Sequence, residues 1–118
     1  MPLPEFLELV NQIKREVREI DVQQLRQMQE AREDFSLIDV REPEETQQGT
    51  VPGAVTIPRG VLEVKIDQVT SDKDRKIVLY CAGGARSALA AYMLQRMGFR
   101  NVLSVIGGYG AWKQTLGR

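Results

Sequence analysis

Short apolar runs alternate along the chain with segments in which apolar residues recur at helical spacing. The runs at 35–40, 76–80 and 101–105 are typical of strands, and a shorter run at 54–57 ends at Pro58. Helical spacing is found at 6–17, 22–28, 62–69, 86–97 and 109–115. The run at 76–80 is nearly unbroken, as expected of a parallel strand covered on both faces.

This alternation predicts an α/β fold, with a mostly parallel central sheet flanked by helices on both faces. The chain of 118 residues is long enough for one modest core. We interpret residues 1–18 as an N-terminal helical extension and 19–118 as the domain with the sheet. The stripe Phe6, Val10, Ile13 and Val17 predicts a packing face on the extension. A second subunit is one candidate to cover it, so we expect a monomer or a homodimer.

Charge and hydropathy narrow the classes of partner. Basic and acidic residues number 16 each and are interspersed, which argues against a nucleic-acid surface. No apolar run approaches the length of a membrane span. The first residues lack the basic and apolar regions of a signal peptide, so we expect a cytoplasmic protein with no nucleic-acid or membrane partner.

The chain has one cysteine and no histidine. A single cysteine excludes an internal disulfide. The absence of histidine excludes a Cys–His dyad, a Ser–His–Asp triad and any histidine-ligated metal site. We therefore expect no metal and no cofactor.

The lone cysteine, Cys81, directly follows the most apolar strand. Ligands in open α/β sheets bind at the carboxyl ends of strands, where loops lead into helices. The small residues Ala82, Gly83, Gly84 and Ala85 would let backbone N–H groups turn inward as an anion-binding nest, and the next helix adds its positive end. An ordinary cysteine is only about 3% thiolate at pH 7, and such a setting lowers the thiol pKa. The alternative, a cysteine that merely fills the core, is disfavoured by this context.

Four segments of the chain resemble the single-domain rhodanese family. The loop Cys81–Ser87 resembles its active-site motif Cys-x-x-Gly-x-Arg-Ser. The other three segments are Leu37–Pro43, Val51–Gly60 and Gly98–Trp112, so the resemblance covers roughly residues 20–112 in the family's order. One departure is Thr50-Val51, where the family often has a histidine, and it bears on local packing rather than on the nucleophile.

The resemblance implies sulfane sulfur transfer through a persulfide on Cys81. A small anionic donor such as thiosulfate, or a persulfide, would supply the sulfur, and a thiol, cyanide or partner protein would accept it. The backbone of residues Ala82 to Arg86 would bind the anion. For Arg86 we favour substrate contact over an ion pair at the helix terminus, because a cation there opposes the helix dipole. Arg59 is a further candidate for donor binding, with a plain surface role as its alternative.

Two other functions compete with this interpretation. Cysteine-dependent phosphatases use a Cys-x5-Arg loop, whereas Cys81 and Arg86 give Cys-x4-Arg, a smaller ring that suits a sulfur atom better than a phosphoryl group. A non-catalytic or redox-sensing interaction module is the second alternative, since fold alone does not fix function. Retention of both the cysteine and its loop argues for the transferase.

Overall fold

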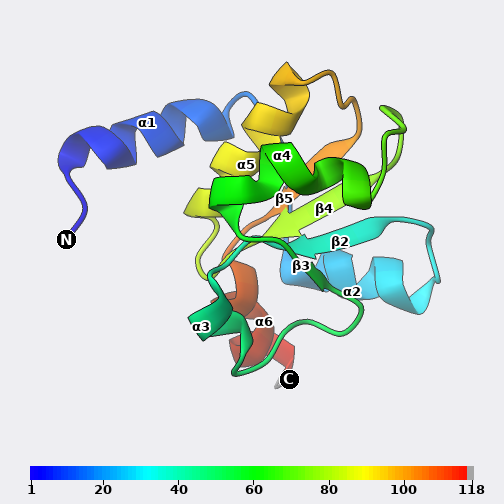
Figure 1. Cartoon of the computed structure of the whole chain (residues 1–118). Helices are drawn as coiled ribbons and strands as arrows, with labels where there is room; N and C mark the ends of the chain where they lie inside the picture. The colour runs from blue at the N-terminus through cyan, green and yellow to red at the C-terminus, as the bar shows by residue number, and fades with distance from the viewer. Residues whose placement is uncertain (117–118) are drawn as a thin grey trace.

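The computed structural model describes residues 1–116, and its helices surround a central sheet (Figure 1). The helices are α1 (Pro4–Lys14), α2 (Val22–Glu30), α3 (Pro43–Thr46), α4 (Leu62–Lys65), α5 (Ala85–Arg96) and α6 (Gly108–Leu116), with 3-10 turns η1 (Arg59–Val61) and η2 (Ile66–Gln68) on either side of α4. The strands are β1 (Arg18–Ile20), β2 (Ser36–Asp39), β3 (Val55–Thr56), β4 (Ile77–Tyr80) and β5 (Val102–Val105).

All five strands are parallel, and their order is β1-β5-β4-β2-β3. The strand that precedes Cys81, β4, lies in the middle of the sheet. In its register, Leu79 stands opposite Ile38 of β2 and Ser104 of β5. The predicted α/β fold with a parallel sheet is therefore confirmed, and the cysteine follows the most enclosed strand.

Side chains of the strands alternate between two apolar cores, one on each face of the sheet. On one face, Ile77 and Leu79 of β4 pack with residues of α4 and α5, including Leu62 and Leu94. On the other face, Val78 and Tyr80 pack with residues of α2 and α6, among them Leu25 and Trp112. Both faces of β4 are thus covered by helices, which explains its nearly unbroken apolar sequence.

The chain before residue 21 differs from the expectation. The first helix ends at Lys14, and Val17 lies outside it, packed against one of the cores. Residues 18–20 form β1, which the sequence pattern did not predict because three residues carry too little periodicity. The boundary expected between residues 18 and 19 falls inside this strand.

Two other short segments also differ in detail. The acidic turn after β2 contains one turn of helix, α3, in which Glu42 and Glu45 form a capping box. The helix expected at 62–69 is divided into α4 and η2. Helix α2 begins with a capping box, in which the side chains of Asp21 and Gln24 each accept from the other's backbone N–H.

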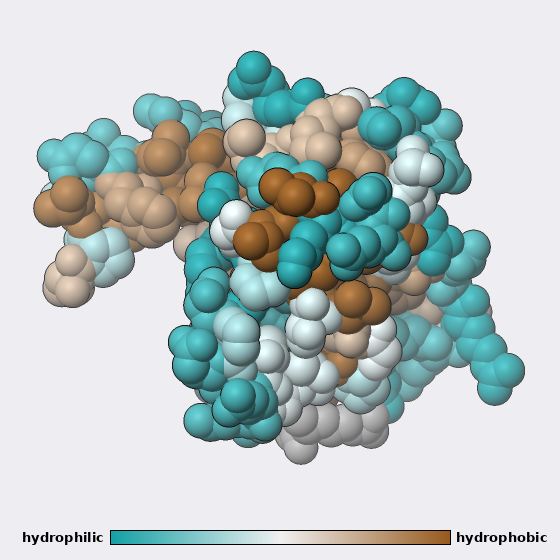
Figure 2. All heavy atoms as spheres, in the orientation of Figure 1, coloured by the Kyte–Doolittle hydropathy of each residue, from teal (hydrophilic) through white to brown (hydrophobic). Residues whose placement is uncertain are grey.

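Helix α1 projects from the body of the molecule and contacts α5 (Figure 1). Of its residues, Val10 is the one that is fully buried, whereas Leu7 and Leu9 are about half exposed. Figure 2 shows apolar side chains gathered along this projecting helix. No helix within residues 1–116 is long and apolar enough to cross a membrane.

Candidate active site

Cys81 begins the loop between β4 and α5, at the carboxyl edge of the sheet. Its side chain is buried, with 1% of the residue exposed, while the next two residues, Ala82 and Gly83, are exposed. The sulfur therefore lies beneath a loop whose outer residues face solvent. Because Ala82 and Gly83 have almost no side chain, their backbone groups are accessible there.

The sulfur atom accepts two backbone hydrogen bonds. The N–H of Gly84 donates to Sγ at 3.1 Å, and the N–H of Ser87 donates at 3.4 Å. The Ser87 hydroxyl lies 3.6 Å from the same sulfur. Burial raises the pKa of the Cys81 thiol, but hydrogen bonds from Ser87, Gly84 and Gly83 outweigh burial and leave the pKa below that of an ordinary cysteine. The loop thus lowers the thiol pKa, which is the direction that the sequence predicts.

Glycines give the loop its close contacts. Gly84 has a φ of 105°, in the left-handed region, and caps α5. Gly108, the first residue of α6, lies so close to the loop that a Cβ there would come within 2.2 Å of the Cys81 carbonyl oxygen. The N–H of Tyr109 donates to that carbonyl at 2.7 Å. The start of α6 therefore holds the backbone of the cysteine in place.

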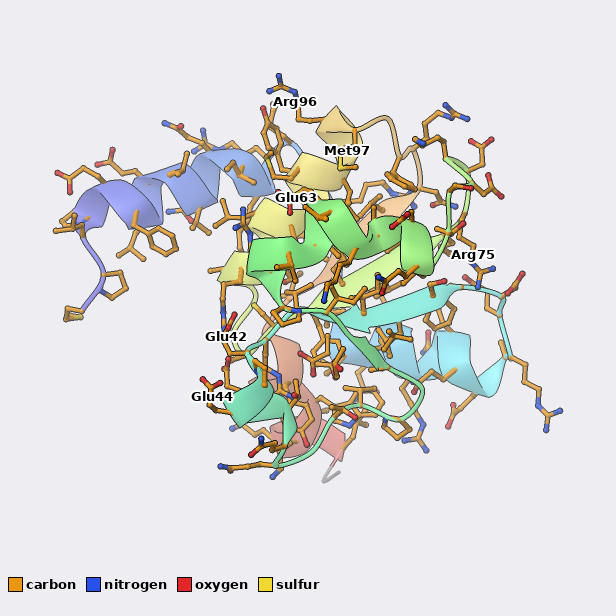
Figure 3. The ribbon with its side chains drawn as sticks, in the orientation of Figure 1. Glu42, Glu44, Glu63, Arg75, Arg96 and Met97 are labelled. Atoms are coloured by element: carbon orange, nitrogen blue, oxygen red, sulfur yellow. The ribbon has the colours of Figure 1, made fainter. Side chains whose placement is uncertain are left out.

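Arg86, the second residue of α5, is paired with Glu45 of α3. Its Nη1 and Nη2 donate to the two carboxylate oxygens at 2.8 and 2.9 Å. This hydrogen bonding lowers the pKa of Glu45 to about 2 and raises the pKa of Arg86. The structure thus contains an ion pair at the helix terminus, the alternative that the sequence interpretation disfavoured. The neighbouring acids Glu42 and Glu44 are exposed at the outer side of α3 (Figure 3).

The remaining candidates lie around this loop. Ala85 is the first residue of α5, and the Ala82 carbonyl accepts from the N–H of Gly110 at 3.0 Å. Arg59 lies beside the end of β2, because its N–H donates to the Val40 carbonyl. The Nε of Arg59 is buried and has no hydrogen-bond partner in the described part of the chain.

A buried ion pair stabilises the segment that carries Glu45. The Arg41 guanidinium donates three hydrogen bonds of 2.8 to 3.1 Å to the Asp39 carboxylate and one to the Gly49 carbonyl. The Tyr109 ring stacks on the Arg41 guanidinium, with 4.2 Å from the central carbon to the ring centroid. This pair joins β2, the α3 segment and α6. These contacts brace the segment between β2 and β3 against the start of α6.

The Thr50-Val51 departure is accommodated by packing. Val51 is buried, and its N–H donates to the Tyr80 hydroxyl at 2.9 Å. The segment at residues 50–51 is therefore held by an apolar side chain and a backbone hydrogen bond.

No group of three metal-ligating side chains is found within residues 1–116.

Three residues of the site were missed by sequence reasoning: Glu45, Lys14 and Ser104. Glu45 is one of several acids in an acidic turn, and nothing in the sequence distinguished it from its neighbours. The Nζ of Lys14 lies 3.8 Å from the position that a Cβ on Gly84 would take, a contact across the fold that no local pattern predicts. Ser104 did carry a signal, since it is a polar residue inside an otherwise apolar strand.

Comparison with known proteins finds one matching domain family and several similar proteins. The sequence model of the rhodanese-like domain family matches residues 21–115 of this chain. A sulfurtransferase of Allochromatium vinosum is 38% identical over 96 residues, which cover 81% of this chain and 88% of that protein. A human single-domain sulfurtransferase has a structure with a TM-score of 0.73 at 25% identity, covering 84% of this chain and 97% of that one.

A third similar protein bears a different description. The structure of a Rhodopseudomonas palustris protein of unknown function, for which a tyrosine phosphatase activity has been suggested, has a TM-score of 0.83 at 31% identity. The match covers 97% of this chain and 95% of that one, so it includes α1 as well as the sheet.

Proposed function

Because the chain belongs to the rhodanese-like domain family, we propose that it transfers sulfane sulfur through a persulfide on Cys81. The donor is thiosulfate or a persulfide, and the acceptor is a thiol, cyanide or a partner protein. The observation that carries the proposal is the pair of amide hydrogen bonds from Gly84 and Ser87 to the Cys81 sulfur. These donors stabilise a thiolate and then the persulfide anion without a histidine base.

Two steps complete the reaction. In the first, the Cys81 thiolate attacks the outer sulfur of thiosulfate, the sulfur–sulfur bond of the donor breaks, and sulfite leaves with the electron pair. In the second, the acceptor attacks the terminal sulfur of the persulfide and the Cys81 thiolate leaves. With cyanide the product is thiocyanate. The enzyme alternates between two forms, so ping-pong kinetics are expected.

The backbone from Ala82 to Arg86 binds the donor anion in this proposal. Exposure of Ala82 and Gly83 supports it, because a donor can approach the backbone there. Arg86 contributes a positive charge at the mouth of the loop while Glu45 fixes its position. Arg59 is proposed as a second cation for the donor, supported by its buried and unpartnered Nε and its place at the carboxyl edge of the sheet.

Loop size argues for a transferase over a phosphatase. Four residues separate Cys81 from Arg86, one fewer than in the Cys-x5-Arg phosphatase loop. In a Cys-x5-Arg loop that begins at Cys81, the arginine would stand at position 87, where this chain has Ser87. We also propose a cytoplasmic location, because a reducing compartment keeps the single cysteine free for sulfur chemistry.

Intact-mass analysis after incubation with thiosulfate tests the proposal. We expect the wild-type protein to gain one sulfur atom, which cyanide or dithiothreitol then removes. Cys81→Ser is the matched control and should gain nothing. A wild-type protein that gains no sulfur but accumulates a sulfenic acid with peroxide would instead be a redox-sensing module, and hydrolysis of a phosphate ester would indicate a phosphatase.

A further inference from the structure

Two buried hydroxyl groups lie behind the Cys81 sulfur. Ser87 of α5 and Ser104 of β5 are both fully buried, and their Oγ atoms are 2.8 Å apart. The neighbours of Ser104 in the strand, Leu103 and Val105, are apolar and buried as well. A hydroxyl in such surroundings is costly unless it is hydrogen-bonded, so the pair requires an explanation.

Counting protons gives the hydrogen bonds a direction. Each serine hydroxyl has one proton to donate and two lone pairs that accept. In residues 1–116, the Ser104 hydroxyl has one hydrogen-bond partner, the Ser87 oxygen. The Ser87 hydroxyl has two further neighbours, the Gly84 carbonyl oxygen at 3.3 Å and the Cys81 sulfur at 3.6 Å. If Ser87 donated to Ser104, the Ser104 proton would lack an acceptor in this part of the chain.

Ser104 therefore donates to Ser87, and the Ser87 proton is left for the loop. When Cys81 is a thiol, its S–H can donate to the Ser87 oxygen while Ser87 donates to the Gly84 carbonyl. When Cys81 loses its proton, the Ser87 hydroxyl can rotate from that carbonyl to the sulfur. Rotation keeps both hydroxyl protons bonded and adds a donor to the anion.

We propose that Ser104 is a positioning residue, whose hydrogen bond to Ser87 polarises and orients the Ser87 hydroxyl as a donor to the Cys81 thiolate. The proposal deepens the proposed sulfur transfer and rests on it for its biological meaning. Within the described residues, Ser104 itself makes no hydrogen bond to the sulfur. The physical effect is on the thiolate, so it can be measured without any sulfur donor.

Charged groups also lie around the loop, among them Arg86, which interacts with the Cys81 charge, and they must stay constant in a test. Besides Arg59, these groups form three ion pairs: Arg86 of α5 with Glu45 of α3, Lys14 of α1 with Glu19 of β1, and Arg41 with Asp39 at the end of β2. The uncharged Ser104 takes part in none of them. A substitution at Ser104 therefore alters a neutral hydrogen bond and leaves these charges in place.

The test is the pH dependence of Cys81 alkylation by iodoacetamide in the full chain. Ser104→Ala should raise the Cys81 pKa and slow alkylation at pH 7 by roughly twofold, because the Ser87 hydroxyl remains but is less polarised and less well oriented. Ser87→Ala should slow it at least as much. In the Ser87→Ala background, Ser104→Ala should add nothing, because its route to the sulfur is gone.

Ser104→Thr and Ser104→Val form a matched pair of almost equal shape that differs in the hydroxyl. Threonine should keep the wild-type alkylation profile, and valine should shift it as alanine does. An unchanged profile in Ser104→Val, or an effect of Ser104→Ala that persists undiminished without the Ser87 hydroxyl, would overturn the proposal. Absence of sulfur transfer would refute the proposed function alone, since alkylation does not depend on it.

Discussion

Arg86 and Glu45 face each other in a two-bond ion pair that joins the start of the helix after Cys81 to the α3 turn. Their atoms are 2.8 and 2.9 Å apart, and each side chain is about one third exposed. The carboxylate balances a cation that would otherwise oppose the positive end of α5. The Arg86 guanidinium can still attract an anion, but its N–H groups are then divided between that anion and the Glu45 carboxylate.

The first prediction concerns the balance of this pair. Arg86→Ala should raise the KM for thiosulfate by roughly tenfold, because a charged hydrogen-bond donor is lost from the mouth of the loop. Glu45→Gln should lower the KM by roughly twofold, because the guanidinium is then less engaged. Steady-state kinetics with cyanide as acceptor measure both. A KM for thiosulfate that neither substitution changes would show that Arg86 does not contact the donor.

The second prediction concerns how the free energy of unfolding depends on pH. Arg86 lowers the folded-state pKa of Glu45 to about 2, below its ordinary value of 4.5. A depressed carboxyl pKa stabilises the fold above the unfolded value and loses that effect as pH falls through the folded value. Wild type should therefore exceed Glu45→Gln in stability by up to about 1 kcal/mol at pH 6, given the partial exposure.

Urea denaturation of both proteins at pH 6, 4 and 2 measures this difference. The advantage of wild type should shrink below pH 4.5 and largely disappear near pH 2. A difference that stays constant down to pH 2 would mean that the pair does not form in solution. The protein with Arg86→Ala is the control, since Glu45→Gln should then have little effect at any pH.

The third prediction concerns the nucleophile. Cys81→Ser should reduce sulfur transfer to the background rate, since an alcohol at this position does not ionise near neutral pH. The melting temperature should change by only a few degrees, because the serine oxygen can still accept from the Gly84 amide. Thiosulfate turnover and thermal unfolding are the two measurements. Turnover that survives in this variant would mean that another group carries the sulfur.

The fourth prediction uses two glycines as a matched pair. Gly108→Ala should destabilise the protein by about 2–4 kcal/mol, because its φ is 54° and a Cβ would collide with the Cys81 carbonyl. Gly60→Ala is the control, with no atom within 4 Å of the new Cβ, and should be nearly neutral. Denaturant unfolding decides between them. Equal stability of the two variants would contradict the tight contact between α6 and the loop.

Much of this architecture follows from local patterns in the sequence. The four apolar strands and the loop at Cys81 are encoded by residues that are close together in the chain, so periodicity finds them. Glu45 meets Arg86, and Ser104 meets Ser87, only after the sheet has assembled. No local pattern ranks one acid of the α3 turn above another. β1 was missed for the same reason, since its three residues become a strand by pairing with β5.

That pairing has a consequence for trimmed forms of the chain. β1 covers the outer edge of β5, with Arg18 opposite Leu103 and Ile20 opposite Val105. A fragment limited to residues 21–115, the span of the family match, would lack this cover. Its β5 would present a row of open N–H and C=O groups along an apolar strand, which is a template for strands of other molecules. Proteolysis before residue 21 should therefore increase aggregation, because the unpaired edge of β5 can then pair with strands of other molecules.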